Sequence, residues 1–98
     1  MTLLYRTDGT IVPIAPSSGV HWTPEELQGL VGGRTENVCT IDGRFMIVNE
    51  RGKIQKPMLP LNKEATRIYY HGRVDPIVGP AVVIDTRLEL DGPEDIVS

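Results

Sequence analysis

The segment that begins at Asn62 carries residue types suited to binding an anion. Asn62 is placed to cap a predicted helix over residues 63–70, and the unpaired N–H groups at a helix amino terminus attract phosphate. Thr66 and Arg67 follow in the next turns, where a hydroxyl and a guanidinium can add hydrogen bonds to the same ligand. The alternative is an ordinary asparagine cap on a helix whose charged side chains face solvent. Both interpretations stay open, and Asn62, Thr66 and Arg67 are candidate phosphate-binding residues.

A second candidate anion site lies at Gly32, Gly33 and Arg34. Backbone N–H groups near glycines can form an anion-binding nest, and an arginine can bond a phosphate with two parallel hydrogen bonds. The competing interpretation is a helix that ends at Gly32, followed by a surface arginine. The helix dipole repels anions at that end, which favours the structural interpretation. Arg34 is kept as a candidate ligand-binding residue.

The sequence also offers side chains that could recognise a base or a ribose. Asn49 follows an apolar run, and its amide could bond the edge of a base or, alternatively, the backbone of its own turn. Tyr70 and Trp22 could stack on a base. Because adjacent residues of a helix point in different directions, we expect one of Tyr69 and Tyr70 to be buried and the other exposed. For Trp22 the competing interpretation is a hydrophobic staple against Leu27.

Patterns typical of catalysis or metal binding do not occur in this chain. His21 and His71 are the only histidines, and neither has the spacing of a nucleophile-activating triad or of a zinc ligand pair. Cys39 is the only cysteine, which precludes an internal disulfide and fits a reducing compartment. We therefore predict a non-enzymatic protein of the cytoplasm, without cofactor or metal.

The charge and the apolar runs exclude further classes of partner. The net charge of -3 lacks the excess of lysine and arginine that duplex nucleic acid requires. The longest apolar run, at residues 81–84, is far too short to cross a membrane. We expect neither duplex nucleic acid nor a membrane as partner, and the acidic balance suits a basic protein.

Local signals predict the elements that must position these residues. Asp-Gly pairs at 8–9 and 42–43 lie between apolar runs and predict hairpins with two-residue turns over residues 2–14 and 38–48. Pro13 places the second strand of the first hairpin at a sheet edge.

A helix is predicted over residues 23–31, with a last core strand over residues 77–84. Thr23 and Glu26 form a capping box at the start of the helix, and Gly32 can end it in the left-handed conformation. Together the elements predict an α+β fold, a small and mostly antiparallel sheet of about five strands with one or two short helices packed on it. Residues 1–90 are expected to form a single domain, and residues 91–98 an acidic, flexible tail.

Four segments carry a resemblance to a known family. Residues 26–33, 48–53, 59–66 and 77–83, in this order, resemble a domain family of unknown function that is common in bacteriophages, plasmids and their hosts. The resemblance covers residues 20–84 and implies a phage or mobile-element origin. It supplies no catalytic residues.

Two functional hypotheses follow from the residues and the resemblance. The first is a phage protein that binds and sequesters a small nucleotide-like signal in the host cytoplasm and so counters antiviral defence. The alternative is a protein-interaction module that inhibits a host protein by occlusion. In either case we expect a homo-oligomer, because a chain of 98 residues with few aromatics buries only a modest core.

Overall fold

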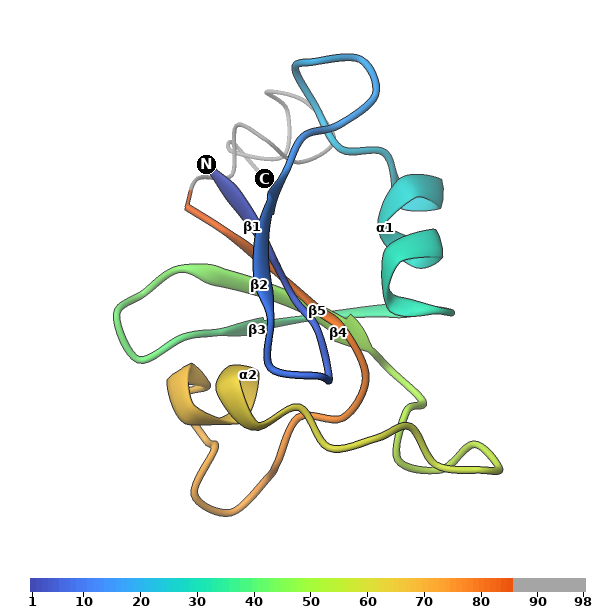
Figure 1. The fold of residues 1–98 in the computed structure, drawn as a ribbon, viewed down its shortest axis with the longest axis vertical. Helices are drawn as coiled ribbons and strands as arrows, with labels where there is room; N and C mark the ends of the chain where they lie inside the picture. Colours follow the sequence, from blue (N-terminus) through green and yellow to red (C-terminus); the bar gives the residue numbers. More distant parts are fainter. Residues whose placement is uncertain (86–98) are drawn as a thin grey trace.

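The computed structural model describes residues 1–85, which form one antiparallel sheet with a helix on each face. Within this range the sheet has five strands in the order β2-β1-β5-β4-β3. The helices are α1 (Pro24–Val31) and α2 (Lys63–Ile68) (Figure 1). The strands are β1 (Thr2–Tyr5), β2 (Ile11–Ile14), β3 (Thr35–Cys39), β4 (Phe45–Asn49) and β5 (Ala81–Ile84). The predicted α+β fold is confirmed, whereas the predicted tail over residues 91–98 lies outside the described residues.

The core consists of two clusters, one on each face of the sheet. Every residue of β5 is buried, because this strand is central and is covered on both sides. Alternation along β5 sends Val82 and Ile84 to the α1 side and Ala81 and Val83 to the α2 side. An uninterrupted apolar run in the sequence therefore marks the strand with no solvent-facing side.

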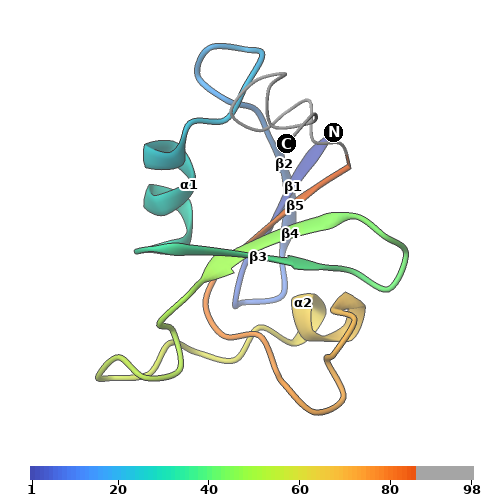
Figure 2. The same cartoon turned by 180° about the vertical axis from the view of Figure 1, so that it is seen from behind.

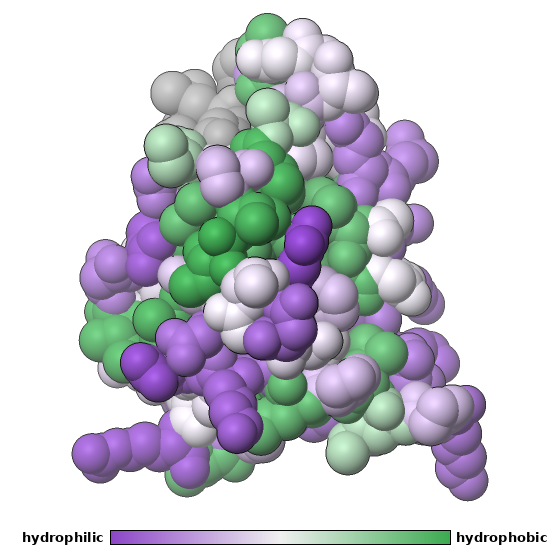
Figure 3. All heavy atoms as spheres, in the orientation of Figure 1, coloured by the Kyte–Doolittle hydropathy of each residue, from purple (hydrophilic) through white to green (hydrophobic). Residues whose placement is uncertain are grey.

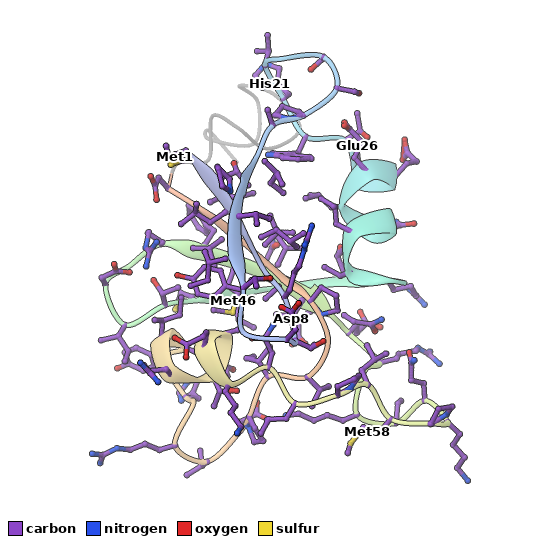
Figure 4. All side chains as sticks on the ribbon, viewed as in Figure 1. Met1, Asp8, His21, Glu26, Met46 and Met58 are labelled. Carbon is purple, nitrogen blue, oxygen red and sulfur yellow. The ribbon has the colours of Figure 1, made fainter. Side chains whose placement is uncertain are left out.

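Helix α1 begins and ends where its local signals predict. The Thr23 hydroxyl accepts a hydrogen bond from the Glu26 N–H, and the Glu26 carboxylate accepts one from the Thr23 N–H, which completes the capping box. Gly32 ends the helix with a φ of 83°. Glu26 stands at the amino-terminal end of α1 (Figure 4) and also accepts a hydrogen bond from the Ser17 N–H. Hydrogen bonds from the Ser17 and Thr23 backbones lower the pKa of the Glu26 carboxyl.

Substituting Thr23 by alanine should lower the free energy of unfolding by about 1 kcal/mol, since an N–H in the first turn loses its acceptor. A urea denaturation series on the wild-type protein and the Thr23→Ala variant measures this difference. Equal midpoints for the two proteins would show that the cap contributes nothing.

The turns of the two hairpins differ from the predicted two-residue type. At the first hairpin the Arg6 N–H donates to the Thr10 carbonyl and the Gly9 N–H donates to the Arg6 carbonyl, which makes a three-residue loop. Gly9 has a φ of 92°, and among residues 1–85 no non-glycine residue has a positive φ. A two-residue type I′ turn needs positive φ at both central residues, and Asp8 does not adopt it. The prediction of a two-residue turn was wrong for this reason. The second hairpin has the same three-residue loop, in which Gly43 is the glycine with a positive φ.

Three predicted boundaries also shift. β3 begins at Thr35, and β5 begins only at Ala81. Helix α2 ends at Ile68 rather than at residue 70, because Tyr69 has an extended backbone and bridges to Thr40 beside β3. Tertiary pairing therefore overrides the helical pattern at the end of α2.

The strand β2 forms one edge of the sheet, as Pro13 predicts. Val12 and Ile14 of this strand are only half-buried and pack against the cluster under α1. Figure 3 shows hydrophobic side chains gathered over β1 and β2 on this side of the molecule. In the part of the chain that the structure describes, no helix has the length and apolar character that a membrane crossing needs.

Candidate functional site

Asn62 is buried inside the fold rather than presented to a ligand. It is 0% exposed, and its amide Nδ2 donates to the carbonyls of Tyr5, at 2.9 Å, and Gly79, at 2.8 Å. Its Oδ1 accepts the N–H of Ala65 at 3.1 Å, which caps α2 as predicted. One side chain thus joins the end of β1, the turn before β5 and the start of α2. No polar group of Asn62 is left for a ligand in this conformation.

Asn49 and Thr66 also make their hydrogen bonds within the fold. Asn49 is buried; its Nδ2 donates to the Val31 carbonyl at 3.1 Å, and its Oδ1 accepts the Arg51 N–H at 2.8 Å. This confirms the turn interpretation of Asn49, which in addition ties the turn to the end of α1. The Thr66 hydroxyl accepts the Ile77 N–H at 2.8 Å. Both side chains therefore fix loops at the end of the sheet.

Trp22 lies in the core cluster that contains Leu27, as the staple interpretation predicts. It is 3% exposed, and its indole Nε1 donates to the Thr2 hydroxyl at 3.1 Å. The indole face is not accessible for stacking on a ligand in this conformation.

The remaining candidates are exposed but do not converge. Arg34 lies just before the first residue of β3, whereas the Tyr70 N–H bonds the carbonyl of Cys39 at the other end of that strand, at 3.1 Å. A strand of five residues spans about 16 Å, so Arg34 and Tyr70 stand well apart. Arg67 forms an ion pair with Glu64 at 3.2 Å on the surface of α2. Nucleotide binding by these residues stays a prediction.

The structure places a cleft of about 90 Å³ beside β3 that sequence reasoning missed. Its walls come from β3, the end of β4, the turn that follows β4, and the segment before β5. The lining residues are Glu36, Val38, Val48, Asn49, Glu50, Lys53, Tyr69, Asp75, Pro76, Ile77 and Val78.

The cleft combines an apolar floor with an acidic rim. Three carboxylates, those of Glu36, Glu50 and Asp75, line it together with the ammonium of Lys53. Lys53 is paired with Asp75, and Glu50 lies 4.0 Å from the guanidinium of Arg51. Glu36 has no ion-pair partner among residues 1–85. The rim therefore carries an excess of negative charge, and in that range no group of three or more metal-ligating side chains is placed to hold a metal ion.

Tyr69 supplies a polar group inside the cleft. It is 8% exposed, whereas Tyr70 is 62% exposed, which confirms that one of the pair is buried. Its hydroxyl has no hydrogen-bond partner within the described chain. Every fully buried side-chain N or O atom there has a partner, so the Tyr69 hydroxyl keeps some access to solvent, and Tyr69 is one of the residues that line the cleft. Burial raises the pKa of Tyr69, and the nearby charge of Glu36 raises it further. The phenol is therefore neutral at physiological pH and can donate or accept.

The strand β3 presents an unpaired backbone edge next to this cleft. The Arg34 carbonyl accepts from the Glu50 N–H, and the Thr40 N–H donates to the Arg44 carbonyl. The backbone groups of the even-numbered residues of β3 therefore face β4. In an antiparallel ladder the alternate residues direct their backbone groups away from the partner. The N–H and C=O of Thr35 and Asn37 therefore point outward, and within residues 1–85 no strand pairs with them. Figure 2 shows β3 at the front, with α2 beside its carboxyl-terminal end.

Sequence reasoning could not find this site because its parts are far apart along the chain. Glu36 and Tyr69 are 33 positions apart, and a lone glutamate on a short strand has no distinctive pattern. The nearest local indication is the adjacent pair of tyrosines, one of which had to be buried.

Comparisons with known proteins give a family and nothing closer. A search of curated proteins and a search of solved structures each found no match. A family model described as a domain of unknown function, DUF3846, matches residues 2–94. The match includes the first hairpin, which lies outside the segments that carry the resemblance. The chain belongs to the DUF3846 family of domains of unknown function.

Proposed function

We propose that this protein is a non-catalytic interaction module that adds an extended segment of a partner protein as a new strand on the outer edge of β3. The observation that carries this proposal is the unpaired backbone of Thr35 and Asn37 beside a charged cleft. Strand addition gains affinity from main-chain hydrogen bonds and specificity from side-chain pockets along the edge. Both components are present at β3.

The two edges of the sheet differ in a way that supports β3 as the binding edge. Just before β2 the Arg6 N–H donates to the Thr10 carbonyl, so the backbone groups of Thr10 face β1. By alternation the backbone groups of Ile11 and Pro13 face outward. Proline has no N–H to donate, which is a common means of blunting an exposed edge. β3 contains no proline. At Thr35 and Asn37 its edge therefore keeps both the N–H and the C=O of each residue for a partner.

Charge favours a basic partner over a second copy of this chain. Glu36 lies on the strand itself, and Glu50 lies close by in the cleft. A second copy paired along β3 would bring its own acidic rim to the same edge, and like charges across a strand pair are destabilising. A segment rich in lysine or arginine would be attracted instead. The expected homo-oligomer stays a prediction, and its interface need not involve β3.

The nucleotide hypothesis has less support from the geometry. Pockets that enclose small ligands usually have volumes of about 300–1,000 Å³, and the cleft beside β3 is smaller, at about 90 Å³. A hollow of about 510 Å³ between Met1 and residues 13–20 is open, and no lysine or arginine is among the described residues that line it. Phage origin, inhibition of a host protein and sequestration of a signal stay predictions of the resemblance.

Binding of short extended peptides tests the proposal. The probes are capped eight-residue peptides in which threonine alternates with one varied residue, namely lysine, arginine, glutamine, norleucine or glutamate. We expect the best of them to bind with a dissociation constant on the order of 1–100 μM, since only a few main-chain hydrogen bonds form.

The Asn37→Pro variant should lose at least about tenfold in this affinity, because proline removes an outward N–H without breaking the ladder to β4. Asn37→Ser, which keeps the N–H, is the matched control and should bind as the wild type does. No binding by any peptide of the series, or equal binding by Asn37→Pro, would overturn the proposal.

A further inference from the structure

We infer that the cleft beside β3 is a recognition pocket for a lysine or arginine side chain of the added segment. This inference rests on the proposed function and assigns the chemistry of its partner. Three observations carry it: the position of Glu36 on the strand, the unpartnered hydroxyl of Tyr69, and the charge of the rim.

The register of strand addition brings a partner side chain to the cleft. Thr35 and Asn37 would exchange hydrogen bonds with the added strand, so Glu36 would face it in a non-hydrogen-bonded position. Side chains opposite one another at such positions are the closest in a sheet, with Cβ atoms about 4.5–5.5 Å apart. Val38, the next residue on the same side of β3, packs against the cluster that contains Tyr69. The partner residue opposite Glu36 therefore projects toward the mouth of the cleft.

The lining of the cleft matches a long cationic side chain. Val38, Val48 and Ile77 supply an apolar floor for the methylene stem of a lysine or arginine, which packs readily on such surfaces. The carboxylate of Glu36 and the hydroxyl of Tyr69 can accept hydrogen bonds from the charged head. Because Tyr69 is nine-tenths buried and has no partner of its own, a bound donor would fill a vacant hydrogen-bonding position.

The same lining disfavours other side chains. A carboxylate would meet three carboxylates, of which Asp75 is paired with Lys53 and Glu50 with the guanidinium of Arg51, so that Glu36 would repel it without a compensating cation. A purely apolar side chain would desolvate Glu36 without compensating it. The volume of about 90 Å³ admits the end of one side chain. The pocket thus selects by charge and by length.

The test compares matched peptides on matched variants. For the wild-type protein, the lysine and arginine peptides should bind at least about tenfold tighter than the glutamine peptide, as charge-assisted hydrogen bonds predict. Glu36→Gln should remove most of that difference and leave the affinity for the glutamine peptide unchanged. Tyr69→Phe, which keeps the buried ring, should weaken binding of the lysine peptide by about threefold to tenfold. Circular dichroism verifies that both variants are folded.

Glu25→Gln is the control for a general charge effect. Glu25 is an exposed carboxylate on α1, on the opposite face of the sheet, and its removal changes the net charge by the same amount. The Glu25→Gln variant should bind all peptides within about twofold of the wild type, because solvent ions screen an exposed charge on the far face of the sheet. Equal loss from Glu25→Gln and Glu36→Gln, or equal binding of the lysine and glutamine peptides, would overturn the pocket but leave strand addition standing. Failure of every peptide would overturn both.

Discussion

Replacing Asn62 with alanine is expected to lower the free energy of unfolding by about 4 kcal/mol, because three buried backbone groups each lose a hydrogen bond at about 1–3 kcal/mol. The groups that lose the hydrogen bond to Asn62 are the carbonyls of Tyr5 and Gly79 and the N–H of Ala65. The total stability of a domain is typically about 5–15 kcal/mol, so the variant should be only marginally folded. Guanidinium denaturation followed by the fluorescence of Trp22 measures the loss.

The control for Asn62 is Asn37→Ala. Asn37 is an exposed asparagine whose side chain has no hydrogen bond within residues 1–85, and its loss should change stability by less than about 0.5 kcal/mol. If Asn62→Ala were as stable as Asn37→Ala, the buried amide would not hold the fold together. Asn62 would then be open again to the ligand-binding interpretation.

Replacing Trp22 with alanine is expected to cost about 3–5 kcal/mol, the usual range when a buried tryptophan leaves a cavity. The side chain packs in the cluster under α1 and bonds the Thr2 hydroxyl, so both packing and a hydrogen bond are lost. Thermal unfolding followed by circular dichroism is the suitable measurement, since the variant lacks the fluorescent residue.

Tyr70→Ala gives the comparison with an exposed aromatic residue. Because Tyr70 is 62% exposed, its removal should change stability by less than about 1 kcal/mol. A Trp22→Ala variant as stable as Tyr70→Ala would contradict the structural role of the indole and favour a role in ligand stacking.

The sequence predicts the helices and turns of this fold best where the information is local. Thr23, Glu26 and Gly32 specify both ends of α1, and each acts within one turn of the helix. Asn62 is likewise identified as a helix cap. Its bonds to Tyr5 and Gly79 are tertiary, however, and no pattern of neighbouring residues indicates that the same amide also reaches the end of β1.

The errors arise where the structure depends on more than the residues next to one another in the sequence. The Asp-Gly pairs predict hairpins at the correct places, but the type of turn depends on whether Asp8 adopts a positive φ, and the pair alone does not decide this. Helix α2 ends early because Tyr69 pairs beside β3. The cleft is beyond prediction for the same reason, since it exists only once β3 and the segment before β5 lie together.

Amide exchange and chemical shifts of isotopically labelled protein, titrated with the lysine peptide, test strand addition on β3 most directly. We predict that the N–H groups of Thr35 and Asn37 become protected from exchange as the peptide binds, whereas Ile11 on the opposite edge does not change. Binding that leaves both β3 amides unprotected would contradict the account. So would a protein that ignores the peptide and instead responds to a nucleotide through Arg34 or Arg67.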